Sequence, residues 1–344
     1  MAGSSPPSSS STLAIELLPE FGWSIQGQPA FGPGSVFQGF VRVSPSEPTI
    51  QADQIRLSFQ AIEAVRPIEI SAGIVSNTKR QQLFGVQHIM WKGETLGAER
   101  LPFTIQLPLV QYPPSVEDHE YYQCTFRLTA TIERVVERQR SVVGQCHRDI
   151  LYRPFIETCA LKNPLETSQQ ELRVQALDYV PGDSISVRVL QSLPQGSSVT
   201  LSLYQRSRLY AIADVPELTQ LVTSEKWHDA SHLPQLTLAL PRNLLPSLGY
   251  SPMLSISYHL KITIKQRRRH LWATTGPTYE YPINIGTLGY GVRAPDALQV
   301  YSALSQEQLR QEQPKYMEAV QYEDSLPAYD PTRLPSYGYA TLVS

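Results

Sequence analysis

The sequence has few charged residues and no long apolar run. Asp, Glu, Lys and Arg make up 17% of its 344 residues, against roughly a quarter in a typical soluble domain. The formal net charge of −2 gives no reason to expect wholesale binding to nucleic acid. No apolar stretch approaches the roughly 18–20 residues that are needed to cross a bilayer. We therefore expect no membrane-spanning helix.

Cysteine and the marks of secretion are scarce as well. The three cysteines, Cys124, Cys146 and Cys159, are odd in number and contain no Cys-x-x-Cys spacing. Residues 1–11 lack the basic start and apolar core of a signal peptide and are expected to be a disordered lead-in. No Asn-x-Ser/Thr acceptor occurs. These absences favour a cytoplasmic protein.

Catalytic patterns are also missing. His228 and His232 lie four residues apart, but the Glu that a zinc-protease helix requires is absent. Ser76 and Lys79 have a known nucleophile spacing without its partner motifs. The carboxylates are scattered, so no acid–base pair can be nominated. We predict no catalytic residue, no metal site and no cofactor. A divergent enzyme whose site is assembled from distant loops stays open as an alternative.

The pattern that is present is strict alternation of apolar and polar residues. Residues 124–133 and 254–265 alternate without interruption, which is typical of half-buried strands. Shorter alternating runs occupy residues 55–61, 103–109, 199–205 and 234–240. The chain is rich in Pro, with 28 residues, and turn residues separate these runs. The sequence therefore predicts an all-β fold of antiparallel strands.

Two parts of the chain follow the same order of motifs. The long strand in each part follows a Leu-Pro…Pro-Ser stretch, at 107–115 and at 240–247. Earlier in each part a Pro-Gly turn leads into another strand, at 32–43 and at 179–189. Because these pairs recur at offsets of about 130–150 residues, too long for a solenoid repeat, we interpret them as a duplicated domain.

This interpretation gives four segments. The lead-in is followed by two tandem antiparallel β-sandwiches of immunoglobulin-like type, at 12–156 and 157–288. Residues 289–344 are rich in Gln, Glu, Pro, Tyr and Ser, with apolar residues that follow no period. We expect this tail to be disordered, apart from a helical turn or two at 305–313, where Ser305 and Gln308 fit a capping box.

The order and spacing of these motifs resemble the arrestin family, in particular the fungal α-arrestins, or arrestin-related trafficking adaptors. The resemblance covers about residues 12–288. It depends on stretches in both parts of the chain: PGSVFQGFVRV (33–43), IRLSFQAIEAV (55–65), LPFTIQLPLVQYPPS (101–115), YYQCTFRLTATIER (121–134), LPRNLLPS (240–247), ISYHLKITI (256–264) and YEYPINIGT (279–287).

The resemblance implies two arrestin-like β-sandwiches that bind the cytosolic tails of membrane transporters or receptors. It also implies recruitment of a HECT-type ubiquitin ligase, whose WW domains bind Pro-Pro-x-Tyr motifs. Here the tail carries Leu-Pro-x-Tyr twice, and a third, poorer version reads Gln-Pro-Lys-Tyr. Proline stiffens such a ligand and tyrosine enters a pocket. The expected WW-binding residues are Leu326, Pro327, Tyr329, Leu334, Pro335, Tyr337, Pro314 and Tyr316. Chance pairs in a Pro- and Tyr-rich tail are the alternative.

Two weaker candidate sites remain in the sequence. The basic run at Lys265, Arg267, Arg268 and Arg269 could contact anionic lipid or an acidic cargo tail, or could be a solvated hairpin loop. Lys315 is the one lysine of the tail and could accept ubiquitin, or could be incidental.

We therefore expect a non-enzymatic adaptor, cytoplasmic and peripheral to the plasma membrane and endosomes, that promotes ubiquitination, endocytosis and sorting of its cargo. A trafficking scaffold of the same fold that acts without ubiquitin, as in endosomal coats, is the first alternative.

Overall fold

The structure is a computed structural model, and it describes most of the chain. The described residues are 13–18, 23–25, 27–45, 49–66, 69–70, 74–75, 78–116, 119–136, 139–158, 165–166, 172–191, 193–211, 217–266 and 274–318. Their regular structure is almost entirely β-strand, in several sheets with mainly antiparallel pairing. The predicted all-β class is confirmed.

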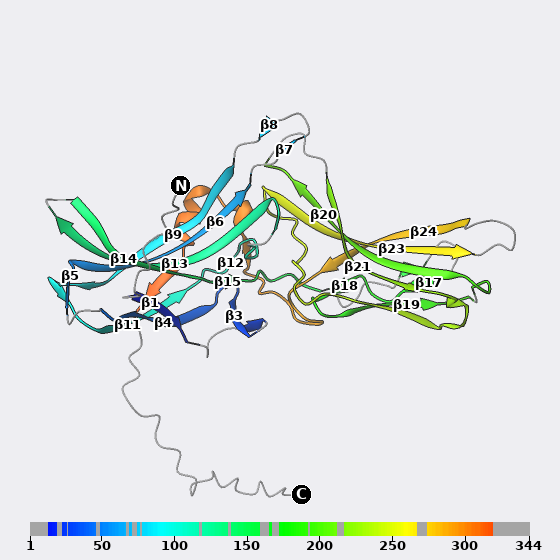
Figure 1. The fold of residues 1–344 in the computed structure, drawn as a ribbon, viewed down its shortest axis with the longest axis horizontal. Coiled ribbons are helices and arrows are strands. Elements are labelled where there is room, and N and C mark those ends of the chain that lie inside the picture. Colours follow the sequence, from blue (N-terminus) through cyan, green and yellow to red (C-terminus); the bar gives the residue numbers. More distant parts are fainter. Residues whose placement is uncertain are drawn as a thin grey trace, which may run out of the picture.

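Two four-stranded sheets dominate the first half, residues 13–158 (Figure 1). Their strand orders are β1-β4-β11-β26 and β14-β13-β6-β9. The strands are β1 (Leu13–Leu17), β4 (Val36–Val43), β6 (Gln54–Val65), β9 (Lys79–Lys92), β11 (Glu99–Gln106), β13 (Tyr122–Val136), β14 (Gln139–Asp149) and β26 (Lys315–Met317). In β6 every second residue is buried, as the sequence period requires.

The second half, residues 165–285, contains a further pair of sheets. Their strand orders are β16-β17-β19-β22 and β18-β24-β23-β20-β21. The strands are β16 (Leu165–Glu166), β17 (Leu172–Val174), β18 (Asp178–Tyr179), β19 (Ser184–Val189), β20 (Ser198–Leu209), β21 (Leu218–Trp227), β22 (Gln235–Ala239), β23 (Leu254–Gln266) and β24 (Thr274–Ile285). The predicted strands at 124–133 and 254–265 thus lie within β13 and β23.

Short elements connect and close these sheets. The remaining strands are β2 (Trp23–Ile25), β3 (Gln28–Phe31), β5 (Ile50–Gln51), β7 (Glu69–Ile70), β8 (Ile74–Val75), β10 (Thr95–Leu96), β12 (Val110–Gln111), β15 (Leu151–Tyr152) and β25 (Gln299–Val300). The helical elements of the described residues are η1 (Ala230–His232), η2 (Tyr301–Ala303) and α1 (Gln306–Gln311). No helix in these ranges is long and apolar enough to cross a membrane.

Aromatic rings join the two layers of the first half. The ring of Phe37 in β4 meets Phe59 in β6 edge-on, with 5.5 Å between centroids. Phe59 in turn contacts Phe84 of β9, and Phe84 contacts Phe126 of β13. Because β4 and β6 belong to different sheets, these contacts form a core between the layers.

The strand order of the first half recurs in the second. The series β1-β4-β11 corresponds to β17-β19-β22, and β14-β13-β6-β9 corresponds to β24-β23-β20-β21. A pair of hydrogen bonds recurs as well. The backbone N–H of Ser115 donates to the Tyr152 carbonyl, and the Ser115 hydroxyl accepts from the Tyr152 N–H. Ser247 forms the same two bonds with Ile285. This correspondence agrees with the duplication inferred from the sequence.

The chain beyond β24 does not follow the prediction of a disordered tail. Residues 286–318, here called the return segment, run back to the first half (Figure 1). There β25 pairs in parallel with β12, and β26 pairs antiparallel with β11. Helix α1 begins at Ser305 with the expected capping box. The prediction of disorder from residue 289 is therefore wrong for 289–318, because aperiodic apolar residues such as Tyr301 and Leu309 pack on a core built elsewhere.

Candidate functional site

Most of the sequence-predicted site residues lie outside the described residues. These are Leu326, Pro327, Tyr329, Leu334, Pro335 and Tyr337 of the two Leu-Pro-x-Tyr tags, and Arg267, Arg268 and Arg269 of the basic run. Lys265 is exposed near the end of β23, and Lys315 is exposed in β26.

The third tag is packed into the fold, which corrects its assignment as a WW ligand. Pro314 is buried, and Tyr316 lies opposite Ile105 in the pairing of β26 with β11. The Tyr316 hydroxyl donates to the Leu57 carbonyl at 2.9 Å, and its ring stacks on His88. Burial raises the pKa of the Tyr316 hydroxyl well above its usual value. A WW domain needs both rings free, so Pro314 and Tyr316 cannot serve it in this arrangement.

A buried carboxylate lies where three distant segments meet. Glu63 of β6 is 0% exposed. Its carboxylate accepts hydrogen bonds from the hydroxyls of Tyr122 in β13 and Tyr301 in η2, each at 2.8 Å, and from the Ser251 hydroxyl before β23. Among the residues that the structure describes, Glu63 has no Lys or Arg ion-pair partner. We call Glu63, Tyr122, Ser251 and Tyr301 the Glu63 cluster.

The Glu63 cluster is protected from water, and its hydroxyls remain donors. Burial is the main cause that raises the pKa of Tyr122 and Tyr301, and the Glu63 carboxylate adds to it. Burial also raises the pKa of the Cys124 thiol, which lies nearby. Buried charge is tolerated only where hydrogen bonds satisfy it. The cluster can therefore fasten the first half, the second half and the return segment to each other.

Further contacts fasten the same junction. At the end of the first half, the backbone N–H of Ile156 donates to the Thr287 hydroxyl at 2.8 Å, and the Thr158 hydroxyl donates to the Leu288 carbonyl at 2.9 Å. A Cβ added to Gly286 would lie 2.5 Å from the Thr158 side chain, so this close approach requires glycine. The Tyr250 hydroxyl donates to the Tyr112 carbonyl across the junction at 2.9 Å.

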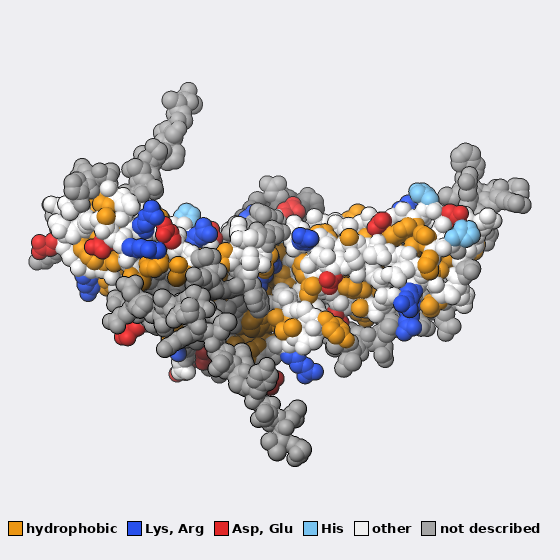
Figure 2. Space-filling view, turned by 90° about the horizontal axis from the view of Figure 1, so that it is seen from below, with side chains coloured by type: hydrophobic (Ala, Val, Ile, Leu, Met, Phe, Trp, Pro, Cys, Tyr) orange, Lys and Arg blue, Asp and Glu red, His pale blue; other side chains and the backbone are white. Residues whose placement is uncertain are grey.

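Two clefts open beside the junction. The first, of about 800 Å³, is mainly polar. It lies between residues 115–116 and 119–121 on one side and strand β21 with residues 241 and 243–245 on the other. The second, of about 760 Å³, is mainly apolar and includes Phe155, Leu248 and Tyr258. Figure 2 shows apolar side chains at the surface where the two halves meet.

Each cleft contains a histidine with a lowered pKa. Burial lowers the pKa of His119 in the first cleft; Glu120 opposes this and Arg66 assists it. Burial, followed by Arg206, lowers the pKa of His259 in the second cleft, against Glu280 and Glu217. Both imidazoles are therefore mainly neutral at pH 7. The Nδ1 of His119 already accepts from the backbone N–H of Tyr121, so its Nε2 is left to donate to a bound chain.

The sequence contains a signal for Glu63, which no catalytic or binding motif includes. Within the alternating strand 55–65 it falls on the apolar parity, with Ile55, Phe59 and Ala61. A charged residue in that position predicts a buried polar contact. Its partners Ser251 and Tyr301 lie 188 and 238 residues away, and no local pattern points to them.

Comparison with known proteins adds no relative. Compared with models of protein families and with curated proteins, the sequence matches none. Within the described ranges no group of three or more His, Cys, Asp or Glu side chains could hold a metal ion. Function has to be inferred from the residues themselves.

Proposed function

We propose that the protein is a non-enzymatic adaptor of arrestin type. Two tandem β-sandwiches would bind the cytosolic tail of a membrane transporter or receptor, and the Leu-Pro-x-Tyr tags would recruit a HECT-type ubiquitin ligase through its WW domains. The observation that carries the proposal is the repeated strand order, β14-β13-β6-β9 and β24-β23-β20-β21, in two halves fastened at a buried junction. The arrestin resemblance implies two tandem β-sandwiches.

The first cleft is the proposed cargo site. It is lined from both halves, and hydroxyl and amide side chains such as Ser207, Gln220 and Asn243 can bond to a peptide backbone. Strand β21 ends its sheet among the described strands. An extended cargo tail can therefore bind along β21 by strand addition, with side-chain pockets supplied by the cleft.

The return segment sets the position of the proposed ligase handle. Strand β26 pairs with β11, and the Tyr316 hydroxyl bonds to the Leu57 carbonyl of β6. The described residues end at Glu318, and the first tag begins at Leu326 in the sequence. The two tags lie eight residues apart. Each binds weakly, but a ligase with tandem WW domains gains roughly 10²–10⁴-fold from both together.

The mechanism is proximity. Cargo in the cleft and ligase on the tags are brought to one molecule, and ubiquitin is transferred to lysines within reach, Lys315 among them. Such an adaptor acts at the plasma membrane and endosomes. The packing of the third tag favours a second candidate, a sorting scaffold that acts without ubiquitin, because it leaves fewer free tags.

The test is a titration of the full chain against the tandem WW domains of a HECT ligase. We expect saturable binding of order micromolar affinity, reduced roughly tenfold or more by Tyr329→Ala combined with Tyr337→Ala. The matched control is Tyr316→Phe, which removes one hydroxyl within the fold and leaves both tags intact. Absence of binding at hundreds of micromolar, or binding unchanged by the double substitution, would favour the ubiquitin-independent scaffold.

A further inference from the structure

The end of the β13–β14 hairpin exposes four valines. Val135, Val136, Val142 and Val143 are each between 47% and 61% exposed. In the antiparallel register Val135 lies opposite Arg140, and Val142 lies opposite Glu133. We call the four valines, with the exposed Arg134 and Arg140, the valine tip.

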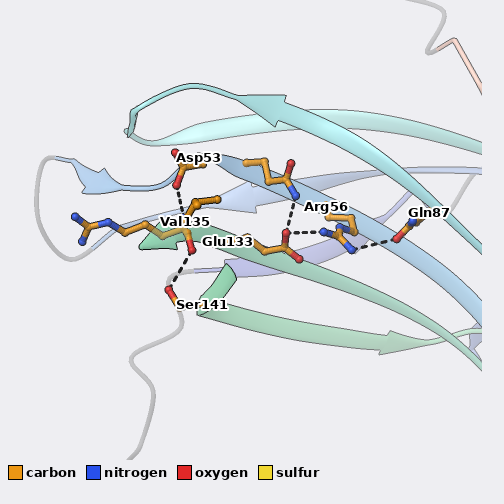
Figure 3. Close-up of polar contacts among 8 residues, drawn as sticks. Asp53, Arg56, Gln87, Glu133, Val135 and Ser141 are labelled. Atoms are coloured by element: carbon orange, nitrogen blue, oxygen red, sulfur yellow. Dashed lines mark hydrogen bonds and ion pairs between the residues drawn. The ribbon is translucent and has the colours of Figure 1, made fainter. Parts of the chain in front are cut away.

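The valine tip is held in place at its base. The backbone N–H of Val135 donates to Asp53 Oδ2 at 2.5 Å, and the Ser141 hydroxyl donates to the carbonyl of Arg134 at 3.1 Å (Figure 3). The backbone N–H of Asp53 donates to the Glu133 carbonyl at 2.9 Å. The apolar side chains are thus presented to solvent by strands β13 and β14, which are paired up to Val136 and Gln139.

Two acidic side chains in the described part of the hairpin, Glu133 and Asp149, already have partners. Glu133 pairs with Arg56 at 2.6 Å and accepts from Gln54 at 2.5 Å (Figure 3). Asp149 pairs with Arg127 at 2.6 Å. In the described part of the chain, Arg134 and Arg140 form no ion pair. Among the described residues, Arg134 and Arg140 therefore present positive charge beside exposed apolar side chains.

We propose that the valine tip docks on an anionic lipid bilayer. Neighbouring strand residues point to opposite faces, so Val135 and Val136 lie on opposite faces of the hairpin. A flat protein partner would cover one face, whereas a bilayer entered end-on covers both. Valine side chains enter the boundary between headgroups and acyl chains, and the arginines lie at the phosphate level. The combination of apolar residues with basic ones is what interfacial anchors require.

The valine tip is separate from the basic run nominated from the sequence. In Figure 1 the β13–β14 hairpin and the end of β23, near Lys265, lie at opposite ends of the long axis. The proposal also does not depend on the ligase handle. A variant with Tyr329→Ala and Tyr337→Ala should therefore bind vesicles as the unmodified chain does.

The test is co-sedimentation of the full chain with phosphatidylcholine vesicles that contain or lack phosphatidylserine. We expect binding only with phosphatidylserine, weakened by added salt. Val135→Ser with Val142→Ser should reduce it roughly tenfold or more, and Arg134→Gln with Arg140→Gln should reduce it roughly fivefold per arginine. Val292→Ser, which changes an exposed valine elsewhere, is the matched control.

A second readout does not depend on affinity. Val142→Trp should show a blue-shifted fluorescence on addition of phosphatidylserine vesicles, and Val292→Trp should not. Circular dichroism confirms that each variant is folded. The proposal is overturned if the chain does not bind these vesicles, if the tip variants bind them unchanged, or if the tip binds polyglutamate in place of lipid.

Discussion

The two halves of the molecule share a strand order but use one buried position differently. Glu63 lies opposite Cys124 in the pairing of β6 with β13, and Ser207 lies opposite Ile256 in the corresponding pairing of β20 with β23. Ser207 accepts from Gln205 of its own strand at 3.2 Å. Glu63 instead bonds across the junction. A buried polar group can thus be satisfied within one copy of a repeat, or can bind the copies together.

The halves also differ at one sheet edge. In the first half β26 of the return segment lies beside β11, whereas β22, which corresponds to β11, ends its sheet among the described strands. The return segment therefore adds a strand to the first half only. This asymmetry places the end of the return segment, up to Glu318, on the first half.

The largest effect expected from this comparison is at the paired positions Glu63 and Ser207. Glu63→Ala should lower the free energy of unfolding by about 3–5 kcal/mol, because three buried hydroxyls lose their acceptor. Ser207→Ala should lower it by only about 1 kcal/mol, the net value of one hydrogen bond. Urea denaturation measures both. Equal losses of unfolding free energy at Glu63 and Ser207 would mean that the buried polar residue has the same role in both halves.

A smaller effect is expected at Tyr316. Tyr316→Ala removes a partly buried ring and a hydrogen bond, and should cost about 2 kcal/mol, whereas Tyr316→Phe should cost about 1 kcal/mol. Amide hydrogen exchange locates the change. Exchange should accelerate in β26 and at the paired residues of β11, while β22 stays unchanged. Acceleration in β22 would contradict an anchor confined to the first half.

The smallest effect concerns pH. Burial lowers the pKa of His119 and His259 in the folded state, so the unfolded chain, with a histidine pKa of about 6.5, binds more protons. The stability that these two histidines contribute is fully present above about pH 6.5 and falls as the pH is lowered below that value. NMR titration should give both pKa values below 6.5. His119→Asn should flatten the decline of unfolding free energy between about pH 7 and pH 5. A steeper decline in this variant would contradict a lowered pKa of His119.

The parts of the fold that the sequence predicted are those with a local period. Strands β13 and β23 follow from alternation alone, and the capping box of α1 follows from Ser305 and Gln308. The return segment was missed because Tyr301 and Tyr316 follow no period, and their stability comes from a core built by other strands. The Glu63 cluster was missed because its partners are brought together only by the folded topology.

The central claim of this comparison is that Glu63 couples the two halves, and a double-mutant cycle tests it directly. Unfolding free energies are measured for the unmodified chain, Glu63→Ala, Ser251→Ala and the double variant, with Ser247→Ala replacing Ser251→Ala in a control cycle. We predict a coupling of about 1 kcal/mol or more between Glu63 and Ser251, and none with Ser247. Additive losses for Glu63 and Ser251, within about 0.5 kcal/mol, would contradict the claim.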